Sequence, residues 1–189
     1  MAFERQTLAA IAARIIVESE LTDWSLARRK AAVELGLAAH GAPLPSDDEI
    51  IAEIKTYHAL FSGHEWTAQL RAQREFALEA MAALSRFSPV LVGPVAEGWA
   101  HAGSEIRIEL KPENPKEVEY ALIELGVEFE PTLTKDGTTL LEVIDGDWPM
   151  RIVVRERGRP TDPRFRVRLS GSQIQALVNE ATAANCAFK

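Results

Sequence analysis

The stretch that decides the fold is residues 91–110, with the sequence LVGPVAEGWAHAGSEIRIEL. An apolar run ends at Gly93, and a segment of mostly small residues follows it. A second run then places charged residues at alternate positions, Glu105, Arg107 and Glu109. Because alternate residues of a β-strand point to the same face, we expect these three side chains on one face of a strand. The stretch therefore predicts two strands joined by a tight turn or a short helix, with a charged face on the second strand.

The second half of the chain continues with short β-branched runs separated by turns, which is typical of a sheet. The turn sequences at residues 136–137 (Asp-Gly) and 145–147 (Asp-Gly-Asp) favour antiparallel hairpins. We expect strands over residues 90–92, 104–110, 127–134, 138–144 and 150–155, and an edge strand over 165–169. A helix is expected over residues 115–125, and Ser170 or Ser172 is expected to cap a closing helix. This half predicts a small mixed sheet closed by a C-terminal helix.

The first half of the chain has the periodicity of helices. Apolar residues at three- and four-residue spacing predict four helices, over about 3–17, 24–35, 47–61 and 65–87. Thr22 or Asp23 is placed to cap the second helix. Ser46, followed three residues later by Glu49, predicts a capping box at the start of the third. The sequence therefore predicts an α+β protein with a helical region over residues 1–88 and a sheet domain over residues 89–189.

The composition is that of an ordinary globular protein, with 189 residues, 47% apolar residues and a net charge of −7. The single cysteine, Cys186, excludes an intramolecular disulfide and fits a reducing compartment. No apolar run approaches the roughly 20 residues needed to cross a bilayer, so we expect a cytoplasmic protein without a membrane partner. The acidic balance argues against a nucleic-acid partner, since that affinity comes mainly from Lys and Arg contacts to phosphate.

One segment departs from the acidic balance. Between residues 151 and 168 the only acidic residues are Glu156 and Asp162, whereas seven arginines are present. The seven are Arg151, Arg155, Arg157, Arg159, Arg164, Arg166 and Arg168. A charge cluster of this kind is most often a solvated or salt-bridged face of a sheet, and the alternative is an anion-binding surface.

Residues 88–155, with their strand, glycine turn and charged strand, resemble the nucleotidyltransferase fold of the DNA polymerase beta superfamily. In that superfamily a Gly-Ser turn precedes a strand that carries two carboxylates two residues apart, and a neighbouring strand supplies a third. The three carboxylates hold two divalent metal ions, which bridge the nucleotide phosphates. The helices before residue 88 are similar to the extension that precedes this domain in some bacterial proteins.

The resemblance places a carboxylate at only one of the three metal-binding positions. Glu105 matches the first position, Arg107 the second, and Arg151 the third. A guanidinium cannot ligate Mg²⁺, so the match implies a pseudoenzyme that has no metal site and needs no cofactor. Pro94 also stands where the family has Ser, and proline has no backbone N–H to offer a phosphate.

The resulting hypothesis is a non-catalytic module that binds a protein partner, or a ligand such as a nucleotide or phosphate. The ligand-binding candidates are Arg107 and Arg151, which can donate bidentate hydrogen bonds to phosphate, together with Gly93 and His101 at and beside the turn. A lone histidine in a loop, such as His101, is usually just exposed. Two alternatives stay open: a Mg²⁺- or Mn²⁺-dependent nucleotidyltransferase that uses other acids, and a metal-independent sensor of nucleotide or phosphate. The other acids are Glu97, Glu109 and Glu142.

Overall fold

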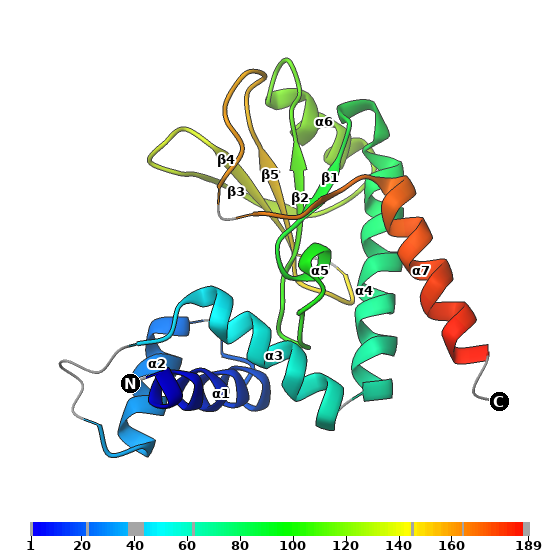
Figure 1. Ribbon diagram of the computed structural model, residues 1–189. Coiled ribbons are helices and arrows are strands. Elements are labelled where there is room, and N and C mark those ends of the chain that lie inside the picture. Colours follow the sequence, from blue (N-terminus) through cyan, green and yellow to red (C-terminus); the bar gives the residue numbers. More distant parts are fainter. Residues whose placement is uncertain are drawn as a thin grey trace. The chain divides into compact units, whose positions relative to one another are not determined.

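The computed structural model describes residues 2–21, 23–37, 44–61, 63–144, 146–163 and 165–186. The chain divides into two compact units. The helical unit comprises Met1–Gln69 and His101–Ser104, and the sheet unit comprises Leu70–Ala100 and Glu105–Lys189. Helices and a six-stranded mixed sheet together confirm the expected α+β class (Figure 1).

The helical unit contains α1 (Ala2–Glu18), α2 (Trp24–Glu34) and α3 (Asp47–Phe61), and α1 packs against the other two helices. The buried side chains of α1 and α2 are mostly small, which lets packed helices approach closely. The buried alanines of these two helices are Ala9, Ala12, Ala13, Ala27, Ala31 and Ala32. Larger apolar side chains, Leu8, Ile16, Ile50 and Ile54, fill the remaining core of the unit.

Side-chain caps explain where two of these helices begin. The Asp23 carboxylate accepts hydrogen bonds from the backbone N–H groups of Ser25 and Leu26, at 2.9 and 3.1 Å. Thr22, the other candidate cap, lies outside the described residues. At α3 the Glu49 N–H donates to Ser46 Oγ at 3.3 Å, and Glu49 Oε2 accepts from the Ser46 N–H at 2.7 Å. The predicted capping box is thus confirmed, and it satisfies amide groups that the first turn of a helix leaves without partners.

The remaining elements form the sheet unit, apart from the first turns of α4 (Gly63–Ala83), which belong to the helical unit. They are η1 (Ser85–Phe87), β1 (Val90–Val92), α5 (Pro94–Glu97), β2 (Ile106–Leu110), α6 (Lys116–Glu124), β3 (Phe129–Leu133), β4 (Thr139–Val143), β5 (Met150–Val154), β6 (Arg168–Leu169) and α7 (Gly171–Cys186). Within the described residues, no helix combines the length and the apolar content that crossing a membrane requires.

The strand order in the sheet is β3-β4-β5-β2-β1-β6. Only β2 and β5 run parallel, and both predicted hairpins, β3–β4 and β4–β5, are confirmed. The edge strand predicted over 165–169 is shorter than expected, because β6 comprises only Arg168–Leu169. The N–H of Phe165 donates to the carbonyl of Asp162 at 3.1 Å, so this residue is held in a turn and not in the sheet.

The two faces of the sheet differ in character, as the alternation of strand residues requires. One face is apolar and buried, and contributes Leu91, Ile106, Ile108, Leu110, Leu141, Ile152 and Val154. Buried side chains of α4, α6 and α7 complete this core, among them Ala77, Met81, Val118, Leu122 and Ile174. The opposite face, here named the polar face, carries Arg107 and Glu109 of β2 with Arg151 of β5. The candidate site lies on the polar face.

Candidate functional site

The register of the central strands sets three charged residues in a row across the polar face. Arg107 on β2 is the direct partner of Arg151 on β5, and Arg151 is the direct partner of Glu142 on β4. Direct partners on neighbouring strands point to the same face. Arg151 therefore shares the face of Arg107, and Glu142 joins them.

These residues and Glu105 form a central cluster of four charges. Glu105 Oε2 accepts a hydrogen bond from Arg107 Nε at 2.6 Å, and its other oxygen, Oε1, pairs with an Arg151 terminal nitrogen at 3.1 Å. The same Arg151 nitrogen donates to Glu142 at 2.6 Å. Two guanidinium groups and two carboxylates make the central cluster neutral, and its side chains are partly exposed.

Arg107 lies beside the Phe165 ring and close to Gly93. The Phe165 ring centroid lies 5.5 Å from the Arg107 guanidinium carbon, a cation–π distance. A Cβ added to Gly93 would lie 3.5 Å from Arg107 Cδ and 3.7 Å from the Phe165 ring. Gly93 has φ +75° and ψ −154°, a conformation that is essentially restricted to glycine. Phe165 therefore packs against Arg107, and Gly93 supplies the backbone conformation of the turn beside them.

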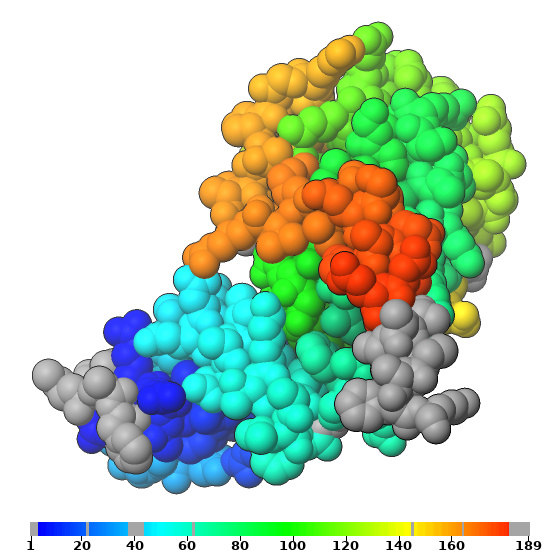
Figure 2. Space-filling view, turned by 45° about the vertical axis from the view of Figure 1, so that its right-hand side comes forward, coloured from blue at the N-terminus to red at the C-terminus, as the bar shows by residue number. Residues whose placement is uncertain are grey.

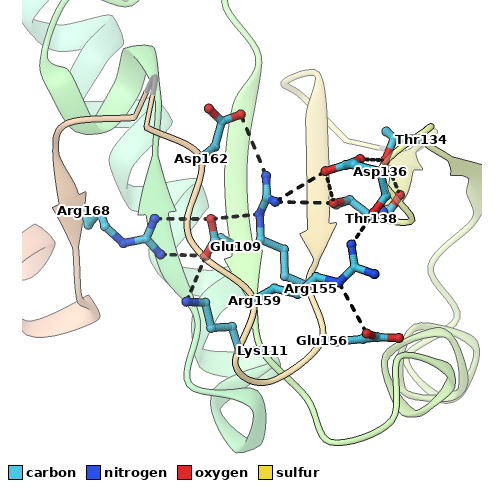
Figure 3. Close-up of polar contacts among 10 residues, drawn as sticks. All are labelled: Glu109, Lys111, Thr134, Asp136, Thr138, Arg155, Glu156, Arg159, Asp162 and Arg168. Carbon is cyan, nitrogen blue, oxygen red and sulfur yellow. Dashed lines mark hydrogen bonds and ion pairs between the residues drawn. The ribbon is translucent and has the colours of Figure 1, made fainter.

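A second group of charges, the Glu109 cluster, lies further along β2 on the same face (Figure 3). Glu109 is 1% exposed and accepts two hydrogen bonds from Arg168 on β6, at 2.8 and 3.2 Å. Arg155 and Lys111 add ion pairs to it at 3.6 and 3.8 Å. Three cations thus surround this buried carboxylate, so they compete with any metal ion for its oxygens.

The segment after β5 is fastened to the β3–β4 hairpin turn, as Figure 3 shows. Arg159 donates to the backbone carbonyl of Asp136, and Arg155 pairs with Asp162 at 3.8 Å. Hydrogen bonds from the Thr134 and Thr138 hydroxyls lower the pKa of the Asp136 carboxyl to about 2. Arg155 also pairs with the Asp136 carboxylate at 3.9 Å, so these contacts hold the segment that leads to β6 against the hairpin turn.

The arginine-rich segment is therefore largely paired within the chain. Five of its seven arginines form ion pairs with carboxylates: Arg151, Arg155, Arg157, Arg159 and Arg168. Arg164 lies outside the described residues. This arrangement matches the salt-bridged sheet face, the first of the two interpretations of the cluster.

His101 belongs to the helical unit, whereas Arg107 and Arg151 belong to the sheet unit. It is 5% exposed, so the exposure expected for a loop histidine is wrong. Its Nδ1 accepts a hydrogen bond from the Gly103 N–H at 3.2 Å, and its backbone N–H donates to Ser104 Oγ at 2.9 Å. Burial lowers the pKa of its imidazole. These contacts give His101 the surroundings of a structural residue in a tight turn.

A second buried histidine, His58 on α3, lies in the same unit. Its ring stacks on Trp66, with ring centroids 4.7 Å apart and planes 5° from parallel. Among the described residues, neither ring nitrogen has a hydrogen-bond partner. Burial, with a smaller contribution from nearby His101, lowers the pKa of His58 to about 4. The sequence pattern predicts a helix at this residue, and its burial follows from tertiary packing.

The described side chains that could ligate a metal ion do not gather at one place. In the part of the chain that the structure describes, no group of three or more His, Cys, Asp or Glu side chains is arranged to hold a metal ion. The side chain of Cys186 lies outside that part. Of the acids considered for an active enzyme, Glu109 and Glu142 pair with arginines and Glu97 accepts from the Trp99 indole at 2.8 Å. These acids are engaged separately and do not converge on one point.

Comparisons with protein-family models, with curated proteins and with solved structures find no significant match to this chain. The geometry of the polar face is therefore the basis for a function.

Proposed function

We propose that this chain is a nucleotidyltransferase-like module that works by binding a protein partner and not by metal-dependent catalysis. The observation that carries the proposal is the central cluster, in which Arg107 and Arg151 lie in register and share Glu105. At the matching positions a two-metal site needs three carboxylates. A divalent cation that approached this cluster would meet two guanidinium groups, which repel it and cannot act as ligands.

The same pairing favours a protein partner over a phosphate ligand. A phosphate-binding arginine needs guanidinium donors that are free to form a bidentate contact. Here Arg107 and Arg151 already pair with Glu105, and Arg151 also pairs with Glu142. A phosphate would have to compete with these carboxylates, which lie in place. The sensor alternative is therefore the less favoured of the two binding functions.

A thermal-shift series tests the proposal. The full chain is heated with each of the four nucleoside triphosphates and with inorganic phosphate, with and without Mg²⁺ or Mn²⁺. We expect no shift in Tm under these conditions. A shift that requires metal would overturn the proposal in favour of an enzyme, and a shift without metal would overturn it in favour of a sensor.

A double variant, Arg107→Asp/Arg151→Asp, sharpens the test because it restores carboxylates to the two changed positions. The variant would then have four carboxylates close together, the two introduced ones with Glu105 and Glu142. Because a bound divalent cation would neutralise their repulsion, we expect Mg²⁺ or Mn²⁺ to raise the Tm of this variant by several degrees. Arg86→Asp/Arg157→Asp is the matched control, since it changes the net charge equally at two exposed positions. The control is expected to show no metal-dependent shift.

A further inference from the structure

An apolar groove lies between α1 and α3 of the helical unit, with a volume of about 510 Å³. Its lining includes Ala10 and Ile11 of α1 with Tyr57 and Phe61 of α3. Figure 2 shows the surface of α3 in cyan beside that of α1 in blue. A groove between two helices is a common docking site for an amphipathic helix, whose apolar stripe inserts between them.

Exposed aromatic surface marks the α3 wall of the groove. Phe61 is 72% exposed, and its ring packs against Tyr57 with the centroids 4.9 Å apart. The next residue back, Leu60, is 71% exposed but does not line the groove. Aromatic side chains on a rim of this kind supply large apolar contact area at small cost in side-chain entropy. Phe61 is therefore the expected anchor for a partner.

The charges that line the groove favour a partner of one charge sign. Arg14, the lining cation, is paired with Glu34 at 2.5 Å. Glu18, the lining acid, accepts its hydrogen bond from the uncharged hydroxyl of Tyr57 at 2.9 Å, so this contact leaves the negative charge in place. Residues 1–69 also contain ten Asp and Glu against six Lys and Arg, a net charge of −4. The groove is therefore complementary to a cationic helix.

We propose that the α1–α3 groove binds a basic amphipathic helix of a partner protein. The apolar stripe of that helix packs on Ile11, Tyr57 and Phe61, and one of its Lys or Arg side chains pairs with Glu18. This inference rests on the proposed function as a protein-binding module, for which it names the surface and the chemistry of the partner.

Fluorescence anisotropy of a labelled 14-residue Leu/Lys amphipathic helical peptide with the full chain tests the inference. A Leu/Glu peptide with the same apolar stripe is the charge control. We expect the Leu/Lys peptide to bind and the Leu/Glu peptide to bind at least about tenfold more weakly. Absence of Leu/Lys binding, or equal binding of both peptides, would overturn the inference.

Three substitutions locate the binding. We expect Phe61→Ala to weaken the Leu/Lys complex about tenfold or more, as for an interface anchor, and Leu60→Ala to change it less than about twofold. Glu18→Gln is expected to weaken binding of the Leu/Lys peptide and to leave that of the Leu/Glu peptide unchanged. Equal losses in the Phe61 and Leu60 variants would place the peptide elsewhere and contradict the inference. The nucleotide and metal series tests the proposed function separately, because its ligands differ from the peptides used here.

Discussion

Arg107 and Arg151 lie directly opposite each other on the parallel strands β2 and β5, and each pairs with a different oxygen of Glu105. Like charges at such positions destabilise a sheet unless a counter-charge lies between them. Glu105 supplies that counter-charge, and Glu142 supplies a second one to Arg151. The charges at the centre of the polar face therefore stabilise one another, and Glu105 is the partner that the two arginines share.

Removing one arginine of the pair is expected to lower the free energy of unfolding only slightly. Removing both is expected to lower it by more than the sum of the two single losses. In Arg107→Ala or Arg151→Ala the other arginine still pairs with Glu105, so we expect about 1 kcal/mol of destabilisation. In the double variant Glu105 loses both partners, and the extra loss appears as a coupling free energy. Urea unfolding of the wild type, the two single variants and the double variant measures this coupling. Strictly additive losses would show that the two pairs act independently.

The helices, strands and hairpins were predictable because each depends on local chemistry. The capping box of Ser46 and Glu49 needs only a three-residue spacing, and the Asp136-Gly137 turn needs only the positive φ that glycine allows. The length of β6 was not predictable. The alternating pattern over 165–169 is typical of a strand, but the Phe165 N–H donates to the carbonyl of Asp162 in a turn and is not available to the sheet.

The alternating pattern of the sequence predicted that three charged residues share one face, but it did not predict which residues they pair with. Alternation along β2 and the position of β5 brought Glu105, Arg107 and Arg151 together, as expected. The pairing of Glu109 with Arg168 joins residues 59 positions apart, and strand order alone decides it. The burial of His101 likewise depends on packing that the local sequence does not encode. Long-range contacts of this kind leave no periodicity or turn signal in the sequence.

Substitution of Glu109 is expected to be among the most destabilising single changes in the chain. Glu109→Gln removes the charge that three buried or half-buried cations share, and removing one partner of a buried ion pair costs about 3–5 kcal/mol. Glu113→Gln is the matched control, because Glu113 pairs with Arg157 where both side chains are exposed. The control is expected to cost less than about 1 kcal/mol.

Chemical denaturation of both variants measures the difference. Should Glu109→Gln fail to fold, the double variant Glu109→Gln/Arg168→Gln tests the same idea, because it also removes one of the uncompensated cations. We expect the double variant to be more stable than Glu109→Gln alone. The opposite order would contradict an electrostatic role for Glu109.

Gly93 is expected to tolerate no side chain, for a conformational reason. Its φ of +75° and ψ of −154° are costly for any L-residue with a Cβ, so Gly93→Ala should destabilise the protein by about 1–3 kcal/mol. Gly63→Ala is the control, since Gly63 lies in α4 with nothing within 4 Å of an added Cβ. Alanine there is expected to be neutral or stabilising, because it favours the helix. Equal melting temperatures of the two variants would argue against strain at Gly93.

Acidification is expected to destabilise the protein between pH 6.5 and pH 4 through His58. Burial lowers the pKa of His58 from 6.5 to about 4 in the folded state. Between these values the unfolded chain binds a proton that the folded chain does not, so the free energy of unfolding falls as the pH falls. The contribution of neutral His58 to the free energy of unfolding is thus fully present above pH 6.5. About 3 kcal/mol of it is lost by pH 4.

Substitution of His58 separates this effect from the titration of other groups, including buried His101, whose pKa is lowered in the same direction. His58→Phe keeps an aromatic ring beside Trp66 and removes two ring nitrogens that have no partner among the described residues. Urea unfolding at pH 7, 6, 5 and 4 should therefore show a shallower dependence on pH in His58→Phe than in the wild type. His64→Phe, at an exposed position of α4, should retain the wild-type dependence. If both variants keep the wild-type slope, the acid sensitivity comes from other groups and the neutral, buried state of His58 is not what stabilises the helical unit.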